Sequence, residues 1–239
     1  MVTFRDGLAQ PSPNPISGPS KSLIALIALE LKELPWEPVF CDLASGAQLG
    51  KPYRDIASFG LVPLLEIGGL KIQQSLAIIE YLEASFPHVP LLPADEAGRA
   101  YARSLAQLVA CEVHPVNNLR ILNYLRQMLA ISEEQVQSWY RHWCVEGLTL
   151  IERELENGCR GAYAIGDSPS IVDCFLVPQV FNARRFKVDM AAFPRICGVV
   201  EECMALPAFQ RAEPSRQADA IGGVAAPPSG LAGGGVTDR

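Results

Sequence analysis

Two short features in the first half of the chain contain the groups best suited to binding a small anionic ligand. Val62 precedes Pro63, and proline biases the residue before it towards extended geometry, which can leave the Val62 N–H and C=O facing outward. Gln74 and Ser75 stand where a helical pattern begins, and the first N–H groups of a helix lack partners and carry partial positive charge. Together they predict a backbone edge for an extended ligand beside a carboxylate site. Taken singly, Val-Pro is also typical of a turn and Gln-Ser of a helix cap.

A β-hairpin followed by a helix would hold these residues in place. The apolar runs 64–67 and 70–72 are separated only by Gly68-Gly69, and glycine tolerates the positive φ angles of a two-residue hairpin turn. Ser75 is the expected N-cap of the helix that follows. The apolar residues of that helix recur at helical spacing on one stripe, as Leu76, Ile79, Leu82 and Phe86. The sequence therefore predicts the order strand, turn, strand and helix.

The composition is typical of a soluble globular protein. The 239 residues, 49% of them hydrophobic, suffice for two small domains or one large one and can bury a sizeable core. The net charge of -6, with no basic stripe, argues against nucleic-acid binding, which needs clustered Lys and Arg. The longest apolar run, residues 23–29, is too short to span a membrane, and the first residues lack a signal-peptide pattern. We expect a cytoplasmic protein with no nucleic-acid or membrane partner.

The cysteines and histidines form no metal or disulfide pattern. The seven cysteines are odd in number and include no C-x-x-C pair, which is typical of a reducing compartment. The three histidines, His88, His114 and His142, have no metal-binding spacing to one another. We therefore expect packed or surface histidines and no metal site.

The first half is predicted to be an α/β domain with an irregular beginning. Residues 1–21 contain four prolines, and because proline cannot donate to a β-ladder this segment is not expected to form a central strand. A helix is predicted over 22–34 and a short strand over 38–43. Three prolines among residues 87–93 oppose regular structure, so the first domain, 22–86, is expected to end there.

The second half, residues 95–216, is predicted to be all helical. A helical pattern covers 95–112 and is broken at His114-Pro115. The tail, 217–239, is rich in Gly, Ala and Pro without a period and is predicted to be disordered. Two capping boxes of structural character are expected to open later helices, Ser132 with Gln135 and Ser170 with Asp173.

Three stretches of the sequence resemble the zeta class of glutathione transferases, the group that includes the maleylacetoacetate and maleylpyruvate isomerases. They are Val62-Pro63 with the Gly-Gly hairpin and QQSLAIIEYLE, then CEVHPVNNLRILNYLR at 111–126 and FLVPQVFNARRFKVD at 175–189. The resemblance covers roughly residues 22–215. It implies the glutathione transferase fold, an N-terminal thioredoxin-like α/β domain followed by a C-terminal all-α domain, and a homodimer.

The resemblance assigns glutathione-binding roles to residues of the first domain. Val62 is expected to pair with the backbone of the glutathione cysteine, while Gln74 and Ser75 hold the γ-glutamyl carboxylate. Gln48 falls on a glutathione-contacting glutamine, although a polar loop residue needs no such role. Glutathione is thus the implied cofactor.

The resemblance also extends to residues of the helical half. Asn117 and Asn118 would face glutathione or the substrate, although two asparagines after a His-Pro break are also good turn residues. The basic residue that follows them in the maleylpyruvate branch is Leu119 here. Arg185 matches an arginine that meets the substrate carboxylate, which a guanidinium can bind bidentately. A surface position is the more common fate of an arginine.

The turn that contains the catalytic serine in the resembled family departs from the family pattern here. In that family a buried strand ends in an arginine, followed by a Ser-rich turn and a helix. Two registers are possible, PSKS at 19–22, which puts Pro19 at the serine position, and SGPS at 17–20; neither restores the arginine. A hydroxyl donor and a helix N-terminus can favour a thiolate, so Ser20 or Ser17 is the candidate catalytic residue. Both serines could equally be ordinary loop and cap residues.

The function that the resemblance implies is glutathione-dependent cis–trans isomerisation of a maleyl keto acid in the catabolism of aromatic compounds. The substrate would be maleylacetoacetate or maleylpyruvate, and the product its fumaryl isomer. A thiolate adds to the conjugated double bond, the resulting single bond rotates, and elimination returns glutathione. General glutathione transferase activity is a side interpretation. The alternative from a different class is a non-catalytic binding or dimerisation protein of the same fold, which the altered turn favours.

Overall fold

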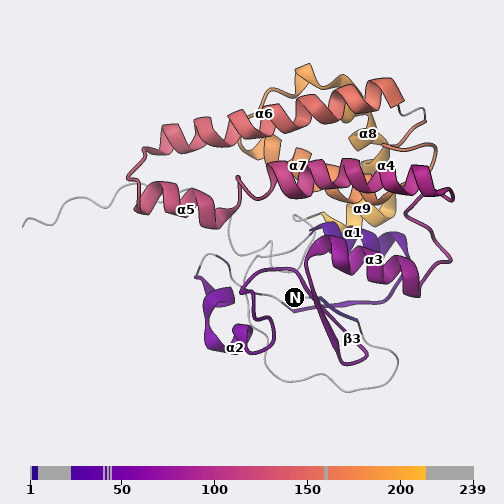
Figure 1. Cartoon of the computed structure of the whole chain (residues 1–239), viewed down its shortest axis with the longest axis horizontal. Coiled ribbons are helices and arrows are strands. Elements are labelled where there is room, and N and C mark those ends of the chain that lie inside the picture. The colour runs from indigo at the N-terminus through magenta and orange to yellow at the C-terminus, as the bar shows by residue number, and fades with distance from the viewer. Residues whose placement is uncertain are drawn as a thin grey trace, which may run out of the picture.

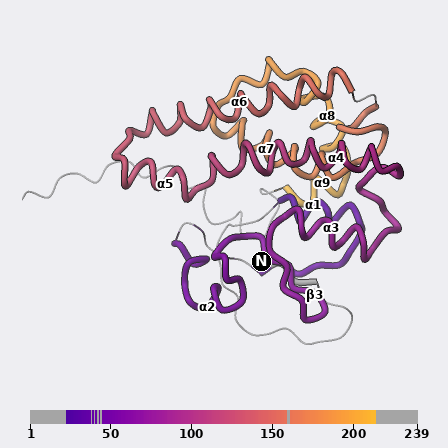
Figure 2. The backbone as a smooth tube through the Cα atoms, in the orientation of Figure 1, coloured from indigo at the N-terminus to yellow at the C-terminus, as the bar shows by residue number. Residues whose placement is uncertain are grey.

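The computed structural model describes residues 2–4, 23–39, 41, 43, 45–158 and 161–213. A small sheet with its helices forms the first half, and the second half is entirely helical in the described residues. Figure 1 shows the helices of the second half stacked above the sheet half, and Figure 2 shows the same path as a backbone tube.

Four strands form one sheet in the order β2-β1-β3-β4. β1 is antiparallel to β2 and parallel to β3, while β3 and β4 are antiparallel neighbours. The strands are β1 Val2–Phe4, β2 Glu37–Pro38, β3 Leu64–Ile67 and β4 Leu70–Gln73.

The position of β1 corrects one prediction about the N-terminal segment. The prolines of residues 1–21 predict no central strand there, yet Val2–Phe4 lies between two other strands. The reason is local, because Val, Thr and Phe have high β-propensity and the prolines begin only at Pro11. Residues 5–22 lie outside the described part of the chain. The strand expected over 38–43 is shorter than predicted, since β2 ends at Pro38.

The predicted hairpin is confirmed, and the helix after it begins as expected to within one residue. Gly68 and Gly69 have φ angles of 53° and 83°, the left-handed geometry that the two-residue turn requires. Helix α3 is Ser75–Ser85, and its N-cap is Gln74 with φ 74°, not Ser75. The predicted N-cap was wrong by one residue because Gln74 has a left-handed backbone, and the chain turns from β4 into the helix at that residue.

The helices of the first half cover the sheet on both faces. Helix α1, Leu23–Leu31, and helix α3 pack into the main core, where Ile78, Ile79 and Leu82 are fully buried. The opposite face is covered by a short helix η1, Ala47–Leu49, and by α2, Lys51–Arg54. A second, smaller core lies there, made of Cys41, Tyr53, Ala57 and Leu64.

The helical half continues the main core from α1 and α3. Figure 1 shows α1 and α3 between the sheet and the helices of the second half. The break predicted at His114-Pro115 is confirmed, because a π-helical segment ends directly before it. The elements are α4 Glu96–Gln107, the π-helix η2 Leu108–Val113, α5 Leu119–Gln127, α6 Glu133–Gly158, α7 Ile171–Arg185, η3 Met190–Ala192, α8 Pro194–Ala205 and α9 Pro207–Ala212.

Both predicted capping boxes are present. The Ser132 N–H donates to Gln135 Oε1 at 3.0 Å, and the Gln135 N–H donates to Ser132 Oγ at 3.3 Å. At the start of α7 the Ser170 N–H donates to Asp173 Oδ2 at 2.7 Å, and the Ser170 side chain accepts in return. These boxes satisfy N–H groups that the helices leave without partners.

A buried lysine joins the first half to the connection that leads into the second. Lys32 is 0% exposed, and its Nζ donates to the carbonyls of Phe86 at 2.9 Å and Val89 at 2.7 Å. The same Nζ lies 2.8 Å from Glu83 Oε2, and the Glu83 carboxylate accepts the Leu91 N–H at 3.0 Å. The Leu91 carbonyl in turn accepts from the first residue of α7 at 2.8 Å. The charge is buried but fully paired, which is the condition for tolerating it.

Helix α6 crosses η2 at a glycine. A Cβ added to Gly147 would overlap the Val113 side chain. Glycine, with no Cβ, therefore sets how closely α6 and the π-helical turn approach each other.

Candidate functional site

The open end of the β3–β4 hairpin brings Val62 and the start of α3 together. Leu64 faces Gln73 in the antiparallel register, so the residues just outside that pair, Pro63 and Gln74, are neighbours. The Val62–Pro63 peptide bond is cis. Among the described residues, no backbone–backbone hydrogen bond outside the helices and strands engages the Val62 N–H or C=O. A backbone edge and a helix N-terminus thus meet at one end of the sheet.

The N-terminus of α3 suits an anion. Its N-cap, Gln74, is exposed and makes no side-chain capping bond, and the first turn contains no acidic residue. Ser75 is the first helical residue and is half-buried. The dipole of a helix favours negative charge at its N-terminus.

Gln48 lies beside the same edge, in η1. Gly60, two residues before Val62, approaches the Gln48 carbonyl so closely that a Cβ on Gly60 would lie 3.2 Å from that oxygen. The Gln48 Oε1 is buried and has no hydrogen-bond partner within the described part of the chain. Because an unpaired buried amide oxygen is costly, this atom fits a site in which a ligand supplies the donor.

The turn after η2 contains both asparagines named from the sequence, and each has a partner inside the protein. Asn117 is 8% exposed, and its Nδ2 donates to the backbone carbonyl of Tyr140 at 3.4 Å. The Asn117 Oδ1 is buried without a partner among the described residues. Asn118 is the N-cap of α5, and its Oδ1 accepts the Arg120 N–H at 3.1 Å. Asn118 therefore acts as a cap, while Asn117 keeps one acceptor.

Arg185 is the last residue of α7 and is exposed. The next residue, Phe186, stacks on Tyr140, with ring centroids 3.6 Å apart and an interplanar angle of 7°. Burial raises the pKa of Tyr140, and the positive charge of Arg185 acts on that pKa in the opposite direction. The end of α7 thus brings Arg185 to the same part of α6 that holds Asn117.

The two candidate catalytic serines cannot be placed relative to these groups. Ser17 and Ser20 both lie outside the described residues. The first described residue of α1, Leu23, follows both of them in the sequence by a short interval.

Sequence reasoning missed a set of buried polar residues around Tyr140. Tyr140 is 4% exposed and Gln179, on α7, is 0% exposed. The Gln179 Nε2 lies 3.2 Å from Cys144 Sγ, while its Oε1 has no partner among the described residues. The available signal was spacing, because Val136, Tyr140 and Cys144 recur every four residues on the buried face of α6.

Three of the buried cysteines, Cys144, Cys174 and Cys203, supply no thiolate of their own. Burial raises the pKa of Cys144 to about 11. Burial also raises the pKa of Cys174 and of Cys203, and the Asp173 carboxylate raises both further. These three thiols are therefore protonated at neutral pH and are weak nucleophiles.

No metal centre is evident in the part of the chain that the structure describes. That part contains no cluster of three or more His, Cys, Asp or Glu side chains arranged to hold an ion. Burial lowers the pKa of His114 to about 4, so this histidine is neutral at pH 7. None of the described helices is long and apolar enough to cross a bilayer.

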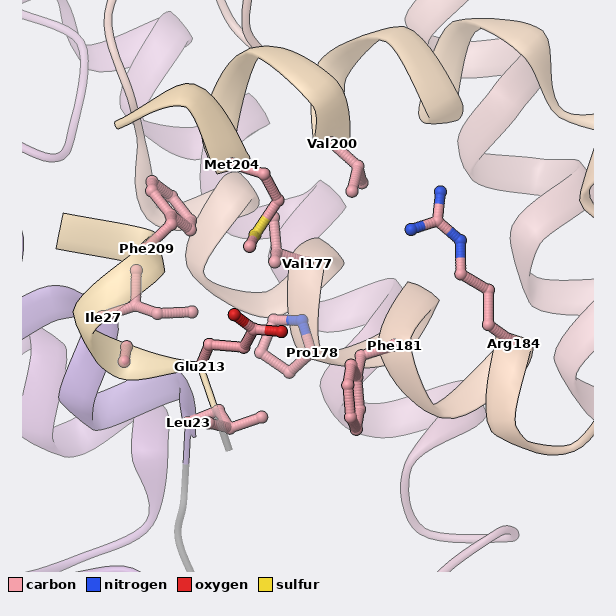
Figure 3. A pocket seen from close by; sticks show the side chains of 11 residues that line it. Leu23, Ile27, Val177, Pro178, Phe181, Arg184, Val200, Met204, Phe209 and Glu213 are labelled. Carbon is pink, nitrogen blue, oxygen red and sulfur yellow. The ribbon is translucent and has the colours of Figure 1, made fainter. Parts of the chain in front are cut away.

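An apolar pocket with a volume of about 110 Å³ lies between α1, α7, α8 and α9. Figure 3 shows Leu23 and Ile27 of α1 on one side and Phe181 of α7 on another. Its two charged lining residues are Arg184, towards the end of α7, and Glu213. None of the described candidate residues lines it, so the pocket is distinct from the edge at Val62.

A thioredoxin-like sheet half with a cis-proline before β3, followed by a second half that is helical throughout its described residues, is the fold of a glutathione transferase. The model of the glutathione S-transferase N-terminal domain matches residues 20–85, and that of the C-terminal domain matches residues 146–207.

Similar proteins show which class of the glutathione transferase family the chain belongs to. Maleylpyruvate isomerase of Ralstonia sp is 42% identical over 194 residues, covering 81% of this chain and 92% of the relative. Maleylacetoacetate isomerase of Pseudomonas aeruginosa is 41% identical over 196 residues, covering 81% of this chain and 91% of the relative. The solved holo structure of a maleyl pyruvate isomerase, described as a bacterial zeta-class glutathione S-transferase, is similar with a TM-score of 0.81 and 42% identity over 83% of this chain and 94% of that one. The chain belongs to the zeta class of the glutathione transferase family, the class of the maleylacetoacetate and maleylpyruvate isomerases.

Proposed function

We propose that this chain is a glutathione-dependent cis–trans isomerase that converts maleylacetoacetate or maleylpyruvate into the fumaryl product during the breakdown of aromatic compounds. The names of its relatives support this reaction. The observation that carries the proposal is the hairpin register, which sets Val62 beside the N-terminus of α3. Glutathione transfer to other electrophiles is a lesser activity of the same site.

The residues at the hairpin end fit glutathione, an extended tripeptide with a free carboxylate at each end. The N-terminus of α3, with Gln74 and Ser75, suits the γ-glutamyl carboxylate. The Val62 N–H and C=O suit pairing with the cysteine backbone, as a strand edge pairs with a peptide. The unpaired Gln48 Oε1 can accept from a ligand N–H. A maleylacetoacetate isomerase of Methylobacterium extorquens, 37% identical with a TM-score of 0.80 over 82% of this chain and 92% of that one, was solved with malonate and glutathione bound.

Bound glutathione supplies a thiol that adds reversibly to the conjugated double bond of the substrate. The buried thiols of Cys144, Cys174 and Cys203 are protonated and do not compete for this role. Arg185 binds a substrate carboxylate through a charge-assisted, bidentate pair. Ser20 or Ser17 donates a hydrogen bond to the sulfur and favours its ionised form. Electrostatic stabilisation of the charge that develops on addition is the main contribution of such a site.

Asn117 and Asn118 form the wall of the site in the helical half. The buried Asn117 Oδ1 can accept a hydrogen bond from glutathione or the substrate. Asn118 contributes mainly by capping α5, which keeps the turn in place.

We further propose that the protein works as a homodimer in the cytoplasm. Exposed apolar side chains gather on α5 and directly after it, and such a patch is typical of an interaction surface. They are Leu119, Tyr124, Met128 and Leu129. Light scattering on the purified protein should give twice the chain mass.

Turnover of both maleyl acids, measured with and without glutathione, tests the proposed reaction. We expect glutathione-dependent isomerisation of at least one acid and retention of the protein on immobilised glutathione. Gln74→Ala should raise the KM for glutathione about tenfold, since a hydrogen bond to a charged group is lost. Ser85→Ala, a change at the exposed last residue of the same helix, is the matched control and should leave this KM unchanged.

Two outcomes would separate the parts of the proposal. Retention on glutathione without turnover of either acid would favour the non-catalytic alternative and contradict the enzyme. Undiminished turnover by a Ser17→Ala, Ser20→Ala double variant would remove the proposed hydroxyl role while leaving the isomerase intact.

A further inference from the structure

Tyr140 contacts the end of helix α7 at the point where Arg185 leaves it. Tyr140 lies on α6 and is 4% exposed. Its ring stacks on Phe186 with centroids 3.6 Å apart and planes only 7° apart. Phe186 is the C-cap of α7 and directly follows Arg185. The stack therefore restrains the backbone from which the Arg185 side chain projects.

The same residue also contacts the asparagine turn. The Tyr140 carbonyl accepts from Asn117 Nδ2 at 3.4 Å. One residue earlier, Trp139 Nε1 donates to the Val116 carbonyl at 2.9 Å. Two consecutive residues of α6 thus hold two consecutive residues of the turn. Asn117 and Arg185, which are far apart in sequence, share one support.

The surroundings of the Tyr140 hydroxyl keep it neutral. Burial raises its pKa well above the ordinary value, while the neighbouring Gln179 amide and the Arg185 guanidinium act in the opposite direction. Gln179 is fully buried and comes from the same helix as Arg185. The Tyr140 side chain is thus buried between α6 and α7, beside the polar side chain of Gln179. Because the hydroxyl stays neutral, the stacking of the ring on Phe186 does not change with pH near neutrality.

We infer that Tyr140 is a positioning residue that holds Arg185 and the Asn117 turn in one fixed arrangement. The inference rests on the proposed function, because it assigns to Arg185 the substrate carboxylate. Tyr140 does not touch the substrate. Its ring is the part that matters, since the contact to Phe186 is made by the ring and the contact to Asn117 by the backbone. Removing the ring should weaken binding of the dicarboxylate more than binding of glutathione.

The experiment compares the replacement of an aromatic ring by leucine at two buried residues. Tyr140→Leu removes the stack, Tyr140→Phe keeps it, and Phe175→Leu makes a similar cut elsewhere on α7, at a side chain that is 1% exposed. The measured quantities are kcat, the KM for the maleyl acid and the KM for glutathione. Calorimetry with malonate in the presence of glutathione gives a second readout that needs no turnover.

Tyr140→Leu should raise the KM for the maleyl acid and the malonate Kd about tenfold, the size of an aromatic pair, with the KM for glutathione changed less than twofold. Tyr140→Phe keeps the ring and should leave the KM for the maleyl acid and the malonate Kd within twofold of the wild-type values. Phe175→Leu should leave both unchanged even if it destabilises the fold.

Two results would overturn the inference. An unchanged malonate Kd in Tyr140→Leu, alongside a raised Kd in Arg185→Gln, would show that Arg185 needs no support from the ring. An equal rise in Phe175→Leu would show general loosening of α7 instead of positioning. If the wild type isomerises neither acid, the proposed function fails, whereas the malonate measurement still decides on Tyr140.

Discussion

The two parts of the candidate site are built in opposite ways. The proposed glutathione edge, Val62 to Ser75, comes from one continuous stretch whose shape is set by a turn and a strand register. The proposed substrate side joins Asn117, Tyr140 and Arg185 from a turn, α6 and α7, and depends on packing between helices. The first part should therefore tolerate changes in the helical core, while the second should respond to them.

The largest effect is expected at Lys32, which joins the sheet half to the connection that leads into the helical half. Lys32→Ala would leave the Glu83 carboxylate and the carbonyls of Phe86 and Val89 buried without their cation. Breaking a buried pair in this way should lower the free energy of unfolding by about 4 kcal/mol. Urea unfolding of the wild type and the variant at pH 7 measures this difference in the free energy of unfolding. The double variant Lys32→Met, Glu83→Leu removes the unpaired charge and should recover only part of the loss, because the carbonyls of Phe86 and Val89 stay without a donor. A loss below about 1 kcal/mol in the single variant would contradict the role.

The next effect concerns His114, directly after η2, and depends on pH. The pKa of His114 is about 4 in the folded chain, against about 6.5 when unfolded. Between these values the unfolded state binds more protons, so the contribution to stability is complete above pH 6.5 and is lost as pH falls towards 4. The free energy of unfolding should drop by about 2 kcal/mol from pH 7 to pH 5 on this account. His114→Gln should flatten that part of the curve, and an unchanged slope would exclude His114 as its source.

Arg185 and Gln74 should separate the two parts kinetically. Arg185→Gln removes a charge-assisted pair and should raise the KM for the maleyl acid about 50-fold, with less than a twofold effect on the KM for glutathione. Gln74→Ala should raise the KM for glutathione about tenfold, with less than a twofold effect on the KM for the maleyl acid. Arg184→Gln, one residue away and lining the separate apolar pocket, is the matched control. Equal effects of both substitutions on both KM values would mean that the two parts are not distinct.

The smallest effect separates a cap from a ligand contact. Asn118→Ala removes the Oδ1 that accepts the Arg120 N–H and should cost about 1 kcal/mol of stability. The kcat/KM should stay within twofold, because the side chain is engaged by α5. Asn118→Ser keeps a capping oxygen and should be nearly neutral. A raised KM with unchanged thermal unfolding would instead assign Asn118 to the ligand.

Local features of the fold were predictable from the sequence. The Gly68-Gly69 turn, the helix after it and both capping boxes depend on residues within a few positions of each other, and the structure contains them all. The N-cap of α3 was wrong by one residue because Gln74 adopts a left-handed backbone that its residue type does not announce. The domain boundary near residues 87–93 stays a prediction, as do the roles of the individual site residues.

Features that depend on distant contacts were not predictable. The strand Val2–Phe4 is too short to stand out, and its central place comes from pairing with Glu37–Pro38 and Leu64–Ile67. Tyr140 has no distinguishing signal in the sequence, because its contacts to Phe186 and Asn117 join residues far apart in the chain. Periodicity identifies which face of a helix is buried, but it does not identify the partner that the face meets.

The bare backbone at Gly147 has a consequence for anyone engineering this protein. Tyr140 is seven residues earlier on the same helix, about 10 Å along its axis. Even a single methyl group at Gly147 would press against Val113 and push α6 outward, and the displacement would reach the support of Asn117 and Arg185. The arrangement of Asn117 and Arg185 would then change through a buried residue of α6 that contacts neither of them.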